Sequence, residues 1–351
     1  MTTNINRPII TYENIALFQS DGPAHSAASN SGDGLSFLPL VQSIDFSVDI
    51  SRTNFGALGT KDFINQSSTN APDVRFSVNT IESFGSLFSG LCSGGVVRDD
   101  LNIDRNFYAI IGSKRGFDVS GESLSGRDVL SFGNCFLNDI SISQSINGLI
   151  NSSYNYVGSN LQAQQLEQTA NLFSGDSPSI DLTGNQSQNV KTLFSGMNNY
   201  YSNEIGAVIP YYSTNITISG SNSVGNFLIK SDSIQSFDLN LPINRKTIYS
   251  LGKKYPVARK ALFPSEASFN FSNRVSNFEV NGDRANLKDF LNSDESYTIN
   301  ISGKDNAKND FNFQISDAKL TSQSYNSSIG SDIVADLGFS FELNKFSKVQ
   351  S

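Results

Sequence analysis

The chain contains nearly the same amphipathic line twice. Residues 41–52 read VQSIDFSVDISR and residues 234–245 read IQSFDLNLPINR, so the two lines stand 193 residues apart, from 41 to 234. Both lines alternate polar and apolar residues, with Ile44 and Phe46 opposite Asp45 in the first copy. Period-two alternation with β-branched and aromatic residues is typical of a strand that buries one face. The repeated line therefore predicts two similar, half-buried β-strands.

The similarity continues beyond the repeated line. RFSVN at 75–79 meets SFNFS at 268–272 in the same register. A further pair, LNDISISQS at 137–145 and ISDAKLTSQS at 315–324, aligns at shorter offsets of 178 (139 to 317) and 179 (144 to 323). Loops of different length between copies would produce such a change. The chain is therefore interpreted as a duplicated domain.

This interpretation divides the chain into five parts. A polar segment rich in Gln, Ser and Asn separates the two copies, and this composition predicts an insertion on an outer surface. The expected parts are an N-terminal arm (1–34), a first copy of the domain (35–165), a polar insertion or linker (166–225), a second copy of the domain (226–346) and a C-terminal tail (347–351).

Each copy shows the same order of elements: the repeated strand, a partner strand, a short helix and closing strands. The helices are expected at 81–91 and 284–292. Pro242 would make the second repeated strand an edge strand, or bulge it. Only 17% of residues are charged, and a surface made of Ser, Asn and Gly suits extended β structure and turns better than long helices. We expect a mainly β fold of two tandem antiparallel β-sandwich or half-barrel domains, each with a short helix.

No catalytic or metal-binding constellation is evident. The single histidine, His25, stands in a Gly- and Ser-rich stretch that offers no rigid scaffold for a triad. The acidic run at 99–104 lacks the glycine and the final glutamate of a calcium loop. Cys92 and Cys135 are expected to be small buried residues or to form one disulfide with each other. We therefore expect no enzyme activity, no cofactor and no bound metal.

Charge and hydropathy restrict the partners. The net charge of −8 argues against nucleic-acid binding through counterion release. The N-terminus lacks the basic start and apolar run of a secretory signal, and no stretch approaches ~18 continuous apolar residues. We expect a protein that has no membrane partner and remains soluble in the compartment where it is made.

Both copies of the repeated line, with the residues that follow them, resemble tail tube (major tail) proteins of tailed bacteriophages. The first copy reads LPLVQSIDFSVDISR…FGALGTKDF, and the second reads IQSFDLNLPINR…SLGKK. The similarity is to two-domain forms, in which the tube fold is duplicated within one chain. The resemblance implies domains that pack side by side in rings, rings that stack, and inner strands that close into a β-barrel through which DNA passes. Three copies of a two-domain chain would complete one pseudo-sixfold ring.

The resemblance also implies partners and a location. The partners would be further copies of the chain, the tape measure protein, baseplate or terminator proteins and, in contractile tails, a sheath. DNA would be transient cargo, and the protein would assemble in the host cytoplasm and reside in the virion tail. The alternatives are a trimeric baseplate hub or tail-completion protein and a β-rich receptor-binding module.

The repeated line supplies the candidate site residues. Ring closure would turn its polar face toward the lumen, and the expected lumen-facing residues are Asp45, Ser47, Asp49, Asp238 and Asn240. Arg52 and Arg245 each end a repeated strand, where a guanidinium can bind carbonyls or a carboxylate of the next domain. A solvated strand end is the alternative for both arginines.

Overall fold

The computed structural model describes most of both halves of the chain. The described residues are 15–21, 36–56, 58, 61–62, 65–68, 72–82, 105–111, 127–158, 160–166, 208–222, 225–229, 234–252, 256, 258–274, 279–280, 283–284, 296–304, 310–326 and 334–349. This part of the chain is mainly β-structure, as the sequence predicts. Its helical segments are two short 3-10 turns, at Tyr211–Ser213 and Leu343–Lys345.

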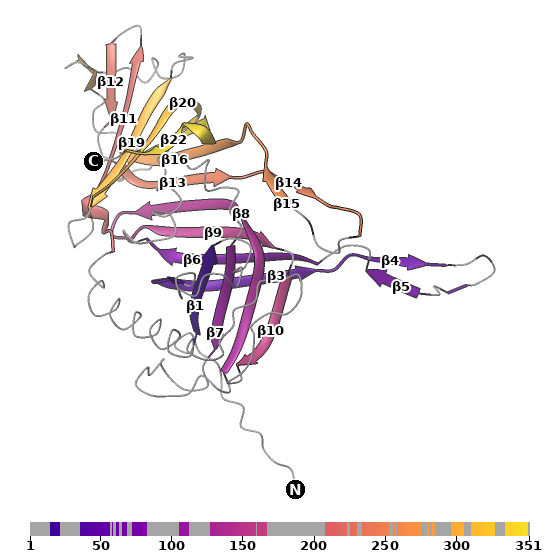
Figure 1. Cartoon of the computed structure of the whole chain (residues 1–351). Helices are drawn as coiled ribbons and strands as arrows, with labels where there is room; N and C mark the ends of the chain where they lie inside the picture. The colour runs from indigo at the N-terminus through magenta and orange to yellow at the C-terminus, as the bar shows by residue number, and fades with distance from the viewer. Residues whose placement is uncertain are drawn as a thin grey trace, which may run out of the picture.

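Eight antiparallel strands form one continuous sheet, which is shown in Figure 1. In spatial order these strands are β3 (Val41–Asp49), β6 (Asp73–Ile81), β9 (Asn151–Gly158), β8 (Arg127–Ser145), β13 (Ile234–Pro242), β16 (Glu266–Arg274), β21 (Val334–Glu342) and β20 (Asp310–Asn326). The pairing of β8 with β13 is the junction at which the two halves of the chain meet edge to edge.

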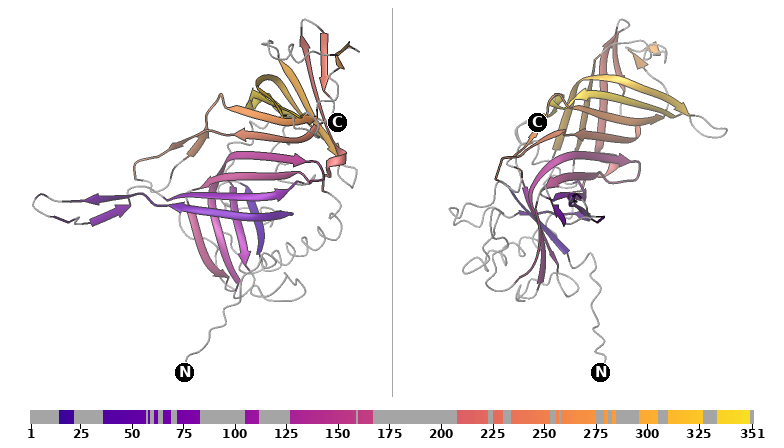
Figure 2. Two further views of the ribbon diagram at one scale, coloured as in Figure 1. Left: turned by 180° about the vertical axis from the view of Figure 1, so that it is seen from behind. Right: turned by 90° about the vertical axis from the view of Figure 1, so that its right-hand side faces the viewer.

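The long strands β8 and β20 each continue into a flanking sheet (Figure 2). The first flanking sheet contains β2 (Ser36–Phe37), β1 (Ile15–Asp21), β7 (Arg105–Ile111), the start of β8 and β10 (Asn160–Leu166). The second contains β12 (Gly225–Ile229), β11 (Thr214–Asn222), β19 (Tyr297–Lys304), the start of β20 and β22 (Phe346–Lys348). Next to β12 lies β17 (Glu279–Val280), which pairs in turn with β18 (Asp283–Arg284).

Each half buries one face of the eight-stranded sheet against its flanking sheet. In the first half, Phe76 of β6 stacks on Phe132 of β8 with ring centroids 4.2 Å apart and contacts Phe107 of β7 at 4.9 Å. In the second half, Tyr297 of β19 meets Phe339 of β21 edge to face at 5.3 Å. All five rings are buried. Alternation along the strands therefore gives each half two layers with an aromatic core.

The strand pairings of the first half recur in the second half. The pairs β1–β2, β1–β7, β3–β6, β6–β9, β7–β8, β8–β9 and β8–β10 correspond to β11–β12, β11–β19, β13–β16, β16–β21, β19–β20, β20–β21 and β20–β22. Two projecting hairpins also correspond, β4 (Arg52–Phe55) with β5 (Asn65–Ser68), and β14 (Arg245–Ile248) with β15 (Ala258–Ala261).

The registers agree in detail. The pairs Ile44–Val78 and Phe237–Phe271 stand at the same offset of 193, from 44 to 237 and from 78 to 271. Asn134 and Asp317, 183 residues apart, hold equivalent places in β8 and β20, and both have positive φ, 53° and 56°. Bulges, which locally shift the pairing of two strands, occur at equivalent points in both halves. The two halves therefore share one strand topology.

Three sequence expectations need correction. The pairings match Leu137 with Leu320, an offset of 183 from 137 to 320, so the sequence alignment at 178 to 179 was wrong in register. Pro242 does not mark an edge: β13 pairs on both sides, and Pro242 is its last residue. Strands β1, β11 and β22 lie in segments expected to be arm, linker and tail, because their pairing partners are distant in sequence.

The expected short helices fall almost entirely outside the described residues. Where the described residues overlap them, Ile81 ends β6 and Arg284 belongs to β18. His25, Cys92 and the acidic run at 99–104 also lie outside the described residues. Cys135 is fully buried, and its thiol donates to the Gly133 carbonyl with a sulfur–oxygen distance of 3.8 Å.

Candidate site: a polar sheet face and two open edges

One face of the eight-stranded sheet carries mostly small polar side chains. Ser, Asn and Asp alternate with the buried apolar residues on every strand, because successive side chains point to opposite faces. This face carries eight acidic residues, Asp45, Asp49, Asp73, Asp139, Asp238, Glu266, Asp336 and Glu342. It carries three basic residues, Arg75, Arg274 and Lys319. The face is therefore net acidic.

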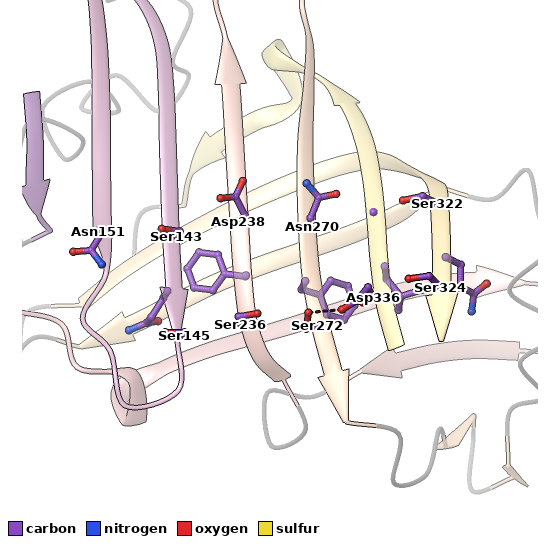
Figure 3. A pocket seen from close by; sticks show the side chains of 16 residues that line it. Ser143, Ser145, Asn151, Ser236, Asp238, Asn270, Ser272, Ser322, Ser324 and Asp336 are labelled. Carbon is purple, nitrogen blue, oxygen red and sulfur yellow. Dashed lines mark hydrogen bonds between the residues drawn. The ribbon is translucent and has the colours of Figure 1, made fainter. Parts of the chain in front are cut away.

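The middle of this face is hollow. Figure 3 shows Ser and Asn side chains from β9, β8, β13, β16 and β20, together with Asp238 and Asp336, lining a hollow of about 610 Å³. Inside it, the Ser272 hydroxyl donates to Asp336 Oδ1 at 2.5 Å. The residues that line the hollow come from both sides of the β8–β13 junction.

The structure places all five expected lumen residues on this polar face. Asp45, Ser47 and Asp49 project from β3, where they are exposed. Asp238 and Asn240 project from β13, four strands further along the sheet. The two groups share a face, but β6, β9 and β8 separate them.

Asp139 on β8 also belongs to the polar face, and sequence reasoning did not single it out. Burial raises the pKa of Asp139, and the nearby charge of Asp238 raises it further, whereas a hydrogen bond donated by Asn155 Nδ2 at 3.1 Å lowers it. Burial also raises the pKa of Asp238. Asp139 and Asp238 lie on the same face of neighbouring strands, but Asp139 is opposite Pro242 and Asp238 is opposite Ser143. Only the pairing of β8 with β13, which the sequence repeat does not give, brings these two residues onto neighbouring strands.

Arg245 begins the hairpin β14–β15 and reaches across the junction. Its Nε donates to the Leu137 carbonyl on β8 at 2.6 Å, and a terminal nitrogen donates to the Arg259 carbonyl at 3.1 Å. The guanidinium also lies 5.4 Å from the ring centroid of Phe136. Burial, and then the charge of Arg259, lower the pKa of Arg245 to about 10. The side chain thus joins the second half of the chain to the first.

Arg259 on β15 is a second cross-junction residue. It is buried, and its guanidinium donates to Asp73 Oδ1 and to the Gly158 carbonyl, both at 3.1 Å. The repeat could not have identified it, because Gln66 stands at the equivalent position 193 residues earlier. The hairpin β14–β15 therefore binds β6, β8 and β9 of the first half through two arginines.

The outer edges of the eight-stranded sheet are β3 and the C-terminal part of β20. Among the described residues, β3 pairs with β6 alone, and this part of β20 pairs with β21 alone. Their equivalents, β13 and β8, pair with each other at the internal junction. The two open edges of the chain therefore correspond to the two edges that join inside it.

The apolar side of β3 is exposed where its counterpart is buried. Relative exposures are 50% for Phe46, 37% for Val48 and 48% for Ile50. At the equivalent positions of β13 and just beyond it, Leu239, Leu241 and Ile243 are exposed by 2%, 0% and 1%. Arg52, the equivalent of Arg245, is likewise exposed on the hairpin β4–β5. Exposed apolar side chains along the outer edge of a sheet mark a surface suited to association.

No protein-family model matches the chain, and no curated protein matches it significantly. Within the described ranges, no group of three or more His, Cys, Asp or Glu side chains could hold a metal ion. The described residues also include no helix that is long and apolar enough to cross a membrane.

Proposed function

We propose that this chain is a structural subunit that assembles head to tail into closed rings, and that the rings stack into a tube. One observation carries the proposal: within the described residues, the chain joins two halves of equal topology edge to edge and leaves the same two kinds of edge open. If the same junction forms between chains, both open edges gain a pairing partner. Heterologous contacts of this kind form rings when their rotation closes.

Three chains would complete a ring of six equivalent halves. Each chain contributes eight strands, so the ring would hold a barrel of 24 strands. At ~4.8 Å between strands, the barrel circumference is roughly 115 Å before strand tilt widens it. Barrels of 16 to 18 strands already leave an aqueous channel, so a wider one provides a conduit. Closure also removes edges that would otherwise promote aggregation.

The polar face supports its assignment to the lumen. It is hollow, net acidic and lined by short side chains, whereas the opposite face is buried against the flanking sheets except along β3. A wall with the same charge sign as phosphate lets DNA slide without counterion-release binding. Together with the resemblance of the repeated line, these features favour a bacteriophage tail tube subunit that resides in the virion, contacts other tail proteins and carries DNA as cargo.

A trimeric baseplate hub or tail-completion protein is the second candidate, since a single ring uses the same junction. Negative-stain microscopy of the purified chain separates these functions. The tail tube proposal predicts tubes of stacked rings with three-fold symmetry, and the hub predicts isolated three-fold rings. Monodisperse monomers at high protein concentration would contradict both.

A further inference from the structure

We infer that β20 of one chain pairs with β3 of the next in the register of the internal β8–β13 junction, and that the hairpin β4–β5 closes over this contact through Arg52. The inference rests on the proposed ring, and it adds the surface that binds the partner, the strand register of the contact and the residue that holds the hairpin in place, Arg52. The partner is a second copy of the same chain.

The register follows from the equivalences between strands. β3 corresponds to β13 at an offset of 193, and the outer part of β20 corresponds to β8 at an offset of 183. Inside the chain the pairs are Leu239–Ile142, Asn240–Ser141 and Leu241–Ile140. The corresponding pairs between chains are Phe46–Tyr325, Ser47–Ser324 and Val48–Gln323.

Exposure of the apolar pair supports this register. Tyr325 is 39% exposed, whereas its equivalent Ile142 is 5% exposed, and Phe46 is 50% exposed against 2% for Leu239. The predicted contact brings these two exposed aromatic side chains opposite each other. Aromatic cross-strand pairs stabilise antiparallel sheets. Both open edges thus carry an apolar side chain at the position where the internal junction buries one.

The hairpins supply the second part of the contact. β14–β15 lies against the first half, whereas β4–β5 projects away from the rest of the described chain (Figure 2). Arg245 donates to the Leu137 carbonyl, and the equivalent acceptor for Arg52 is the Leu320 carbonyl of the next chain. A projecting hairpin of this kind would cover the junction in the same way as β14–β15.

Two departures from the internal junction make the junction between chains weaker. In the junction between chains, Lys319 replaces Phe136, the residue whose ring lies beneath the Arg245 guanidinium in the internal junction. Likewise, Gln66 replaces Arg259, the residue that binds Asp73 in the internal junction. The cation–π contact and the ion pair are therefore absent from the predicted contact. Association between chains should thus be reversible under conditions in which the internal junction remains intact.

Cysteine cross-linking between two single variants tests the register. Ser47→Cys protein is mixed with Ser324→Cys protein under assembly conditions and then oxidised mildly. Both serines are exposed, so neither substitution should disturb folding, and circular dichroism checks this. Directly opposed strand residues lie within disulfide reach, because their Cα atoms are ~4.5–5.5 Å apart. The expected product is a disulfide-linked dimer that forms only in the mixture.

A matched pair provides the control. Ser322→Cys replaces Ser324→Cys and moves the thiol two residues along the same face, by ~6.8 Å. The unsubstituted chain, which keeps Cys92 and Cys135, gives the background. Rings or tubes that form without the Ser47–Ser324 link, or with the Ser47–Ser322 link in its place, would overturn the inference while the ring proposal stands. Absence of both the link and any assembly would overturn the two together.

Discussion

The paired arginines provide a measurable contrast between the internal junction and the open edge. Arg245→Ala removes two hydrogen bonds from a charged donor to carbonyls and a guanidinium–ring contact. Hydrogen bonds to charged groups contribute about 1.5–3 kcal/mol each, and a cation–π contact about 0.5–1 kcal/mol. Arg245 is only partly buried, so water restores some of this loss. The expected decrease in the free energy of unfolding is about 3 kcal/mol.

Arg52→Ala is the matched control, because Arg52 holds the equivalent position on an exposed hairpin. In the unassembled chain its effect should stay within about 0.5 kcal/mol, the usual range for exposed sites. Urea unfolding of dilute protein, monitored by circular dichroism, measures both variants, and an unchanged slope identifies a change in stability. Equal midpoints for Arg245→Ala and the parent would refute the role of Arg245 at the junction. Under assembly conditions, Arg52→Ala should raise the concentration needed for ring formation.

Three further predictions concern the two sheet faces. The raised pKa of Asp139 means that the folded state holds its proton more tightly than the unfolded state, so the stability penalty is present at neutral pH and disappears as pH falls through the folded pKa. Asp139→Asn should therefore increase the free energy of unfolding at pH 7 by less than about 1 kcal/mol after solvent screening, which raises the thermal midpoint. The gain should vanish in acid, and a gain that is independent of pH would contradict this. In urea unfolding of the isolated chain, Leu239→Ala should be destabilising by about 3 kcal/mol and Phe46→Ala by about 1 kcal/mol, because only Leu239 is fully buried. Sedimentation should show that Phe46→Ala weakens association between chains at least as much as it weakens folding. Asp45→Lys with Asp238→Lys should still assemble but should slow DNA ejection from tails at low salt; normal ejection kinetics, with the variant confirmed in the tails, would rule out the lumen role.

The repeated line was predictable because β3 to β6 and β13 to β16 share one offset without insertions. Period-two alternation then placed Asp45 and Asp238 on the polar face. The same reasoning gave the wrong register for β8 and β20. The segments SISQS and LTSQS align because both contain Ser and Gln, whereas the strand pairings align Leu137 with Leu320.

Other features depended on contacts distant in sequence. β11 was expected to be linker, since its TNITISGSN text is rich in polar residues, and only pairing with β19 identifies it as a sheet strand. Arg259 has no arginine counterpart in the first copy, so a repeat-based search could not find it. The side chain gains its role from Asp73 and the Gly158 carbonyl, which lie in the other half. Local periodicity thus predicted strands and faces, whereas tertiary pairing determined the junction.

The number of chains in the assembled ring tests the central claim most directly. Native mass spectrometry of rings released from tubes, together with averaged end-on images, measures this number and the symmetry. Three chains of 38.1 kDa, or about 114 kDa, with six similar lobes in a three-fold average, is the predicted result. Rings of six chains, or open filaments without closure, would contradict a ring in which each chain supplies two equivalent halves.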